Sequence, residues 1–268
     1  METILEPFRY GFMQNSFIAA IAIGIVCAVI GCYVVVRSMS FLGDALSHAV
    51  LPGVAIAYLT GGDLTIGALA AAILVALGIS ALSRQENLKE DSVIGILFTA
   101  AFALGIALIS TIQTYAVDLT HILFGSILGV SADDLKFILI VGALILAAVV
   151  IFYRRFLVVT FDPVMAHTLN WNVQGINLLL LVLIACTITI SIKTVGSGLV
   201  TAMLITPAST ALMLTKRMPQ TMLLAALIGA FSGVAGLYIS YFISISSGAA
   251  IVLTATLIFL IVYAVKSR

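Results

Sequence analysis

Residues 14–36, QNSFIAAIAIGIVCAVIGCYVVV, form an apolar run without a single charged residue. At a rise of about 1.5 Å per residue, a helix of this length crosses the roughly 30 Å hydrocarbon core of a bilayer. The sequence therefore predicts an all-α, polytopic transmembrane helix bundle with about eight or nine spans, forming one membrane domain over residues 1–268. The other apolar runs cover residues 41–60, 64–83, 92–112, 134–153, 174–192, 197–215, 220–243 and 248–265.

Two of these spans carry residues that interrupt a regular membrane helix. The 41–60 run contains Asp44, His48 and Pro52, and the 197–215 run contains Pro207. Proline lacks the backbone donor and clashes with the preceding turn. We therefore expect either span to be broken or re-entrant.

Composition supports a membrane protein and excludes several function classes. Of the 268 residues 63% are hydrophobic and 9% charged, which is too little charge to cover a water-soluble domain. The net charge of +1 provides no basic surface for nucleic acid. The chain has neither the GxxxxGK(S/T) loop that binds ATP phosphates nor the HExxH motif of a metalloprotease.

The lysines and arginines predict the orientation of the chain. Cytoplasmic loops are enriched in Lys and Arg. With the N-terminus outside and nine alternating spans, the C-terminus would lie in the cytoplasm. Residues 1–13 mix charged and aromatic residues, which predicts an interfacial helix. The inner side would then hold Arg37, Arg84, Lys89, Arg154, Arg155, Lys216, Arg217, Lys266 and Arg268, and the outer side Arg9, Lys136 and Lys193.

The longest inner loop is predicted at 154–173, RRFLVVTFDPVMAHTLNWNV. Asp162 is a favourable helix cap, and Pro163 suits the first helical position. A short helix over about 163–170, lying on the inner face, is therefore expected.

Asp44 and His48 lie well inside a predicted span, in SMSFLGDALSHAVLPG, residues 38–53, whereas most of the acidic residues lie at span ends or in loops. A charge inside a span costs about 2.5–3.5 kcal/mol and usually marks function. Four residues apart, the two side chains share one helix face. Carboxylate and imidazole together suit Mn²⁺, Fe²⁺ or Zn²⁺. Because two ligands are too few, a two-fold dimer that doubles the set is the natural complement.

A purely structural interpretation stays open beside this one. In it Asp44 caps a helix start after Gly43, and His48 merely pairs with it. Pro52 and the following glycine favour a broken helix, where transporters place ion sites. The other two histidines are weaker candidates: His121 is typical of an interfacial packing residue, and His167 lies on the predicted loop helix.

The stretch SMSFLGDALSHAVLPGVA resembles the signature of manganese/zinc/iron-type permease subunits of bacterial ABC uptake transporters. Other matches to this family follow in the same order and cover most of residues 38–254. The last of them, ISSGA, lacks the proline that often precedes Ser-Gly in this family. The further matches are DSVIGILF, GIALIS, LFGSILGVS, FDPVMAHTLN, VGSGLVTAMLITPASTA and ISSGAAIVL.

This resemblance implies the partners and the site. The chain would be a homodimeric permease in the inner (cytoplasmic) membrane of a bacterium, with two cytoplasmic ATP-binding subunits and an extracytoplasmic solute-binding protein. Asp44 and His48 would bind the transported divalent metal transiently, Mn²⁺ before Zn²⁺ or Fe²⁺, with no permanent cofactor. ATP hydrolysis would belong to the partner, so the chain itself would not be an enzyme. The ATPase-coupling residues would be Phe161, Asp162, Pro163, Ala166 and His167.

Two alternatives remain from the sequence. An iron-chelate or corrinoid ABC permease keeps the fold, but it needs a wide cavity and no Asp–His pair on one helix face. A secondary metal carrier driven by an ion gradient needs further acids inside the membrane and no coupling helix.

Overall fold

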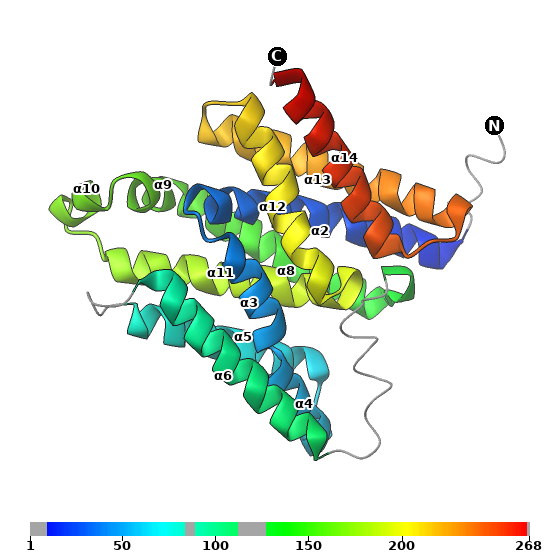
Figure 1. Cartoon of the computed structure of the whole chain (residues 1–268), viewed down its shortest axis with the longest axis horizontal. Coiled ribbons are helices and arrows are strands. Elements are labelled where there is room, and N and C mark those ends of the chain that lie inside the picture. Colours follow the sequence, from blue (N-terminus) through cyan, green and yellow to red (C-terminus); the bar gives the residue numbers. More distant parts are fainter. Residues whose placement is uncertain (1–9, 84–88, 112–126, 267–268) are drawn as a thin grey trace. The chain divides into compact units, whose positions relative to one another are not determined.

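Helices form all the regular structure that the computed structural model describes, in residues 10–83, 89–111 and 127–266 (Figure 1). Within these described residues, eight helical segments are long and apolar enough to cross a membrane. One of the eight is made of two short helices, α3 (Ser40–Ala49) and α4 (Leu51–Thr60). A further helix, α12 (Ser197–Leu214), has a shorter apolar stretch and runs unbroken through Pro207, so the break expected there is absent. The predicted polytopic helix bundle is confirmed.

The other spanning helices begin and end within a few residues of the predicted ranges. Residues 1–9 of the predicted interfacial helix lie outside the described residues, and residues 11–13 form the first turn of the first spanning helix. These helices are α2 (Gly11–Val36), α5 (Leu64–Leu82), α6 (Glu90–Ser110), α8 (Ala132–Ile151), α11 (Val173–Val195), α13 (Met218–Ile243) and α14 (Ser247–Lys266).

The chain divides into two compact units. Unit 1 comprises residues 1–38, 120–144 and 190–268, and it includes the short 3₁₀ helix η2 (Ile127–Gly129). Unit 2 comprises residues 39–119 and 145–189. Two of the four boundaries between the units fall inside helices, at 144/145 in α8 and at 189/190 in α11. The single membrane domain over residues 1–268 stays a prediction.

Close helix packing in unit 1 depends on glycine. The helix α2 packs against α12 and α13. A Cβ atom at Gly24 of α2 would lie 2.6 Å from the carbonyl oxygen of Gly229 in α13. A Cβ atom at Gly31 would overlap the backbone carbonyl of Leu204 in α12. Small residues let helices approach closely in lipid, where the hydrophobic effect does not drive association.

We expect Gly31→Ala to destabilise the protein by about 1–3 kcal/mol, the usual cost of overpacking. Gly95→Ala on α6 is the matched control, because nothing lies within 4 Å of a Cβ atom built there. The measurement is the thermal unfolding midpoint of each purified variant in detergent. Equal midpoints for the two variants would contradict the close contact between α2 and α12.

Unit 2 contains a four-helix group of α3, α4, α5 and α6. Gly53 of α4 and Gly67 of α5 face each other so closely that a Cβ atom on either would overlap the other's carbonyl. The break between α3 and α4 falls at Val50. It follows from Pro52, which has no N–H to donate to the carbonyl of His48 four residues earlier. The interruption predicted for residues 41–60 is therefore present.

The predicted loop at 154–173 contains more structure than expected. It includes α9 (Tyr153–Phe161), which the sequence analysis did not predict, and α10 (Pro163–Thr168), which it did. The helix α9 is amphipathic: Phe156 and Val159 are buried, whereas Arg154 and Arg155 are exposed. Its short length and two adjacent arginines made it resemble a loop.

Candidate metal site

Asp44 and His48 lie on the open face of α3. Phe41, Asp44 and His48 recur at helical spacing along this face, whereas Leu42 and Leu46 are fully buried on the other side. The helix begins at Ser40, with Met39 as its N-terminal flanking residue, so Asp44 is in the middle of α3. The alternative in which Asp44 caps a helix start is therefore wrong.

The two side chains are spaced to share one metal ion. The Nε2 atom of His48 is 3.7 Å from Oδ1 of Asp44, and the side chains are 26% and 44% exposed, respectively. This separation is too long for a direct hydrogen bond. Nitrogen and oxygen ligands bind first-row metals such as zinc at about 2.0–2.2 Å, so one ion can contact two atoms up to about 4 Å apart. The pair thus fits a single metal ion bound by both residues.

Aromatic side chains of α6 surround the imidazole of His48. Its ring centroid lies 5.5 Å from that of Phe102, in a T-shaped arrangement, and 6.2 Å from that of Phe98. The Nδ1 atom is buried and has no hydrogen-bond partner among the described residues. Nε2 is therefore the nitrogen available to a ligand. The sequence analysis missed both phenylalanines, because nothing in the α3 motif indicates which span packs against it.

The described residues supply only part of a metal coordination shell. In the part of the chain that the structure describes, no group of three or more His, Cys, Asp and Glu residues is close enough to hold a metal. His121 lies outside the described residues. Cys27 pairs with the hydroxyl of Ser191 at 3.2 Å, and Cys32 donates to the carbonyl of Ala28 at 3.2 Å, as expected for packing residues. Within the described residues, Asp44 and His48 are thus a pair of ligands without a third.

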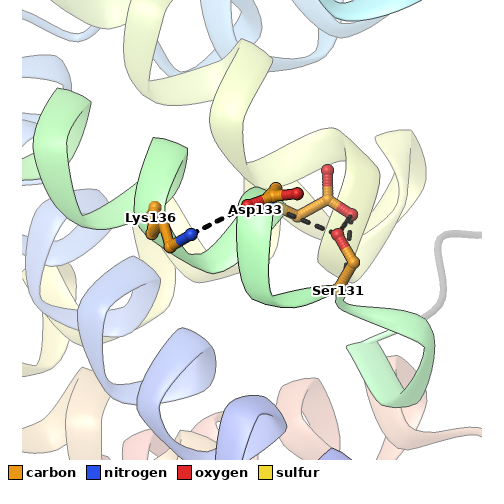
Figure 2. Close-up of polar contacts among 4 residues, drawn as sticks. Ser131, Asp133 and Lys136 are labelled. Carbon is orange, nitrogen blue, oxygen red and sulfur yellow. Dashed lines mark hydrogen bonds and ion pairs between the residues drawn. The ribbon is translucent and has the colours of Figure 1, made fainter.

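Acidic residues at the helix starts have structural partners. Asp63 caps α5 by accepting hydrogen bonds from the backbone N–H groups of Thr65 and Ile66, at 2.7 and 3.1 Å. Figure 2 shows the start of α8, where Asp133 pairs with Lys136 at 2.9 Å. There Ser131 and the adjacent acid Asp134 exchange hydrogen bonds in a capping box. These acids stabilise helix ends, in contrast to Asp44.

An apolar groove of about 500 Å³ also lies in unit 2. It is lined by residues of α4, α5 and α6, among them Ile56, Leu74 and Leu104. Neither Asp44 nor His48 lines it. The groove is therefore not part of the metal site.

The short helix α10 is fixed at both ends. At its start, Oδ1 of Asp162 accepts a hydrogen bond from the N–H of Met165 at 2.9 Å, and Pro163 occupies the first turn. At its end Asn170 adopts a left-handed conformation with φ of 55°. The backbone N–H of Asn170 donates to the backbone carbonyl of His167 at 3.0 Å, and the N–H of Trp171 donates to the carbonyl of Ala166 at 3.1 Å. This is a Schellman motif, which defines the end of the helix.

The outer surface of α10 is apolar. Val164 is 71% exposed and Met165 is 49% exposed, and Phe161 beside them is exposed as well. Ala166 is buried within the chain, whereas Asp162, Pro163 and His167 are exposed. Sequence reasoning missed Val164 and Met165, because the caps set which way a six-residue helix faces.

Comparison with known proteins places this arrangement in a family. The model of the ABC 3 transport family matches residues 9–266. The chain belongs to the ABC 3 transport family and is the membrane subunit of an ABC transporter. The resemblance to metal-transporting ABC permeases is thereby confirmed, and a carrier driven by an ion gradient is set aside.

Similar proteins differ in the metal that their names record. The manganese transport system membrane protein MntC of Halalkalibacterium halodurans is 48% identical over 258 residues, covering 96% of this chain and 88% of that protein. The chelated iron transport system membrane protein YfeD of Yersinia pestis is 40% identical over 258 residues, covering 96% and 86%. The structure of PsaBC from Streptococcus pneumoniae in complex with Fab matches with a TM-score of 0.87 and 38% identity, covering 97% and 94%.

Proposed function

We propose that the chain is the permease subunit of an ATP-driven importer of divalent metal ions, with Mn²⁺ as its main cargo. The observation that carries this proposal is the Asp44–His48 pair, in the middle of a helix within a spanning segment and 3.7 Å apart. Ionisable side chains inside a membrane span are energetically costly, so such a pair usually marks a functional site. Membership of the ABC 3 transport family supports ATP as the energy source.

The ligand chemistry and the relatives favour Mn²⁺. Carboxylate and imidazole ligands without thiolate suit Mn²⁺, whereas thiolates favour Zn²⁺. The thiol of Cys27 is hydrogen-bonded to the hydroxyl of Ser191 rather than placed at the Asp44–His48 pair. The manganese relative is 48% identical and the chelated-iron relative 40%. A chelate already carries its own ligands, whereas a close Asp–His pair is suited to a bare ion.

The proposed complex contains a second copy of this chain, two cytoplasmic ATP-binding subunits and an extracytoplasmic binding protein. The second copy would complete the metal shell with its own Asp and His. The apolar surface formed by Val164 and Met165 of α10 and by Phe161 at the end of α9 is suited to dock on an ATP-binding subunit. In this arrangement the C-terminus lies in the cytoplasm, and the complex lies in the inner membrane. Alternating access then moves the ion past a weak site from which it can leave.

Metal competition in cells tests this proposal. Cells that lack their own manganese uptake would express the chain with its ATP-binding subunit and binding protein. When Mn²⁺, Zn²⁺ and Fe²⁺ are supplied together at equal concentration, we expect the cells to accumulate more ⁵⁴Mn than ⁶⁵Zn or ⁵⁵Fe. Greater accumulation of ⁶⁵Zn or ⁵⁵Fe would contradict the assignment of manganese. Failure to accumulate any divalent metal would contradict the function.

A further inference from the structure

The aromatic cluster around His48 links two helices of unit 2. Phe98 and Phe102 of α6 stack on each other with ring centroids 5.9 Å apart, and both contact the imidazole. Phe41 of α3 meets Phe98 edge-on at 5.8 Å. Aromatic pairs at these separations are attractive and have preferred geometries. The cluster therefore restricts the rotation of the His48 ring.

Among the described residues, the second ring nitrogen of His48 has none of the partners that usually support a metal ligand. A histidine that binds metal almost always donates its other N–H to a carboxylate, a carbonyl or water, which orients the ring and makes it a stronger ligand. Nδ1 of His48 is buried, and it has no such partner among the described residues. The orientation of the His48 ring therefore depends on its packing against Phe98 and Phe102.

We propose that Phe98 and Phe102 are positioning residues for metal transport. They hold the imidazole so that Nε2 faces Asp44. The expected consequence is a metal-binding nitrogen whose direction is set by ring packing. This inference rests on the proposed function, because it assumes that His48 binds the metal.

Phe102→Leu tests the role of the closer ring. We expect the apparent KM for Mn²⁺ uptake to rise by about three- to tenfold, which is the value of an aromatic contact. The maximal rate, basal ATP hydrolysis and assembly of the complex are expected to stay within about twofold, since the metal ligands are retained. Phe102→Tyr keeps the ring and should restore the KM. Leu104→Ala, on the same helix and exposed, is the matched control.

A spectroscopic measurement separates positioning from a general loss of structure. In the purified complex, electron spin echo of bound Mn²⁺ detects the ¹⁴N nucleus of a coordinated imidazole. We expect this signal to weaken in Phe102→Leu and to stay intact in Phe102→Tyr and Leu104→Ala. If Phe102→Leu does not assemble, Phe98→Leu carries the same expectation.

The outcomes distinguish this inference from the proposed function. Unchanged KM and ¹⁴N signal in both leucine variants would overturn the positioning role, while loss of uptake in His48→Ala would leave the proposed function standing. A Phe102→Tyr variant as impaired as Phe102→Leu would also overturn it. Normal uptake by His48→Ala would instead show that the proposed site is wrong.

Discussion

Asp44→Ala and His48→Ala are each expected to reduce Mn²⁺ uptake by about a hundredfold. Loss of an outer-shell partner of a metal ligand typically costs 10- to 100-fold, and these residues are proposed as the ligands themselves. The described part of the chain offers no third metal-binding side chain to compensate. The measurement is the initial rate of ⁵⁴Mn uptake in cells that express each variant with the partner subunits.

Two controls separate loss of the site from loss of the protein. The amount of assembled complex in the membrane should be unchanged, because both side chains lie on the open face of α3 rather than in its packed side. Asp63→Asn is the matched acidic control. Asp63 caps α5 away from the metal pair, and asparagine caps helices equally well. Normal uptake by Asp44→Ala and His48→Ala would rule out this metal site.

Val164→Asp on α10 is expected to separate the membrane subunit from its ATP-binding subunit. In the proposed complex Val164 is buried in the interface. A charged aspartate at this position should therefore weaken binding of the ATP-binding subunit by at least about 2 kcal/mol, or about 30-fold in affinity. The substitution should not unfold α10. Position 164 is in the first turn, where a negative charge stabilises a helix, and the caps at Asp162 and Asn170 remain.

Co-purification measures this effect. The ratio of ATP-binding subunit to membrane subunit after affinity purification should fall in Val164→Asp and stay normal in Val164→Leu, which keeps the surface apolar. Mn²⁺ uptake should fall in parallel. Full retention of the ATP-binding subunit together with normal uptake in Val164→Asp would exclude α10 as the coupling surface.

The parts of the fold that depend on local sequence were predictable. The apolar runs predicted where the spanning helices begin and end to within a few residues, because crossing a bilayer depends on length and hydropathy alone. The four-residue spacing of Asp44 and His48 predicted that they share one helix face, and Pro52 predicted the break after α3. The cap at Asp162 likewise identified the start of α10.

The parts that depend on tertiary packing were not predictable. Phe98 and Phe102 belong to a different span from His48, and an apolar span gives no sign of which side faces a neighbour. The burial of Ala166 and the exposure of Val164 depend on how α10 is held at both ends. The helix α9 was missed because burial of Phe156 and Val159, rather than hydropathy, stabilises it.

Transport by purified components tests the central claim most directly. The complex of this chain with its ATP-binding subunit and binding protein would be placed in liposomes, with wild-type chain or His48→Ala. We predict that the wild-type complex moves ⁵⁴Mn across the membrane when ATP is supplied, that a non-hydrolysable ATP analogue does not support transport, and that His48→Ala transports about a hundredfold more slowly. Equal transport with and without ATP, or equal rates for wild type and His48→Ala, would contradict an ATP-driven importer that uses this site.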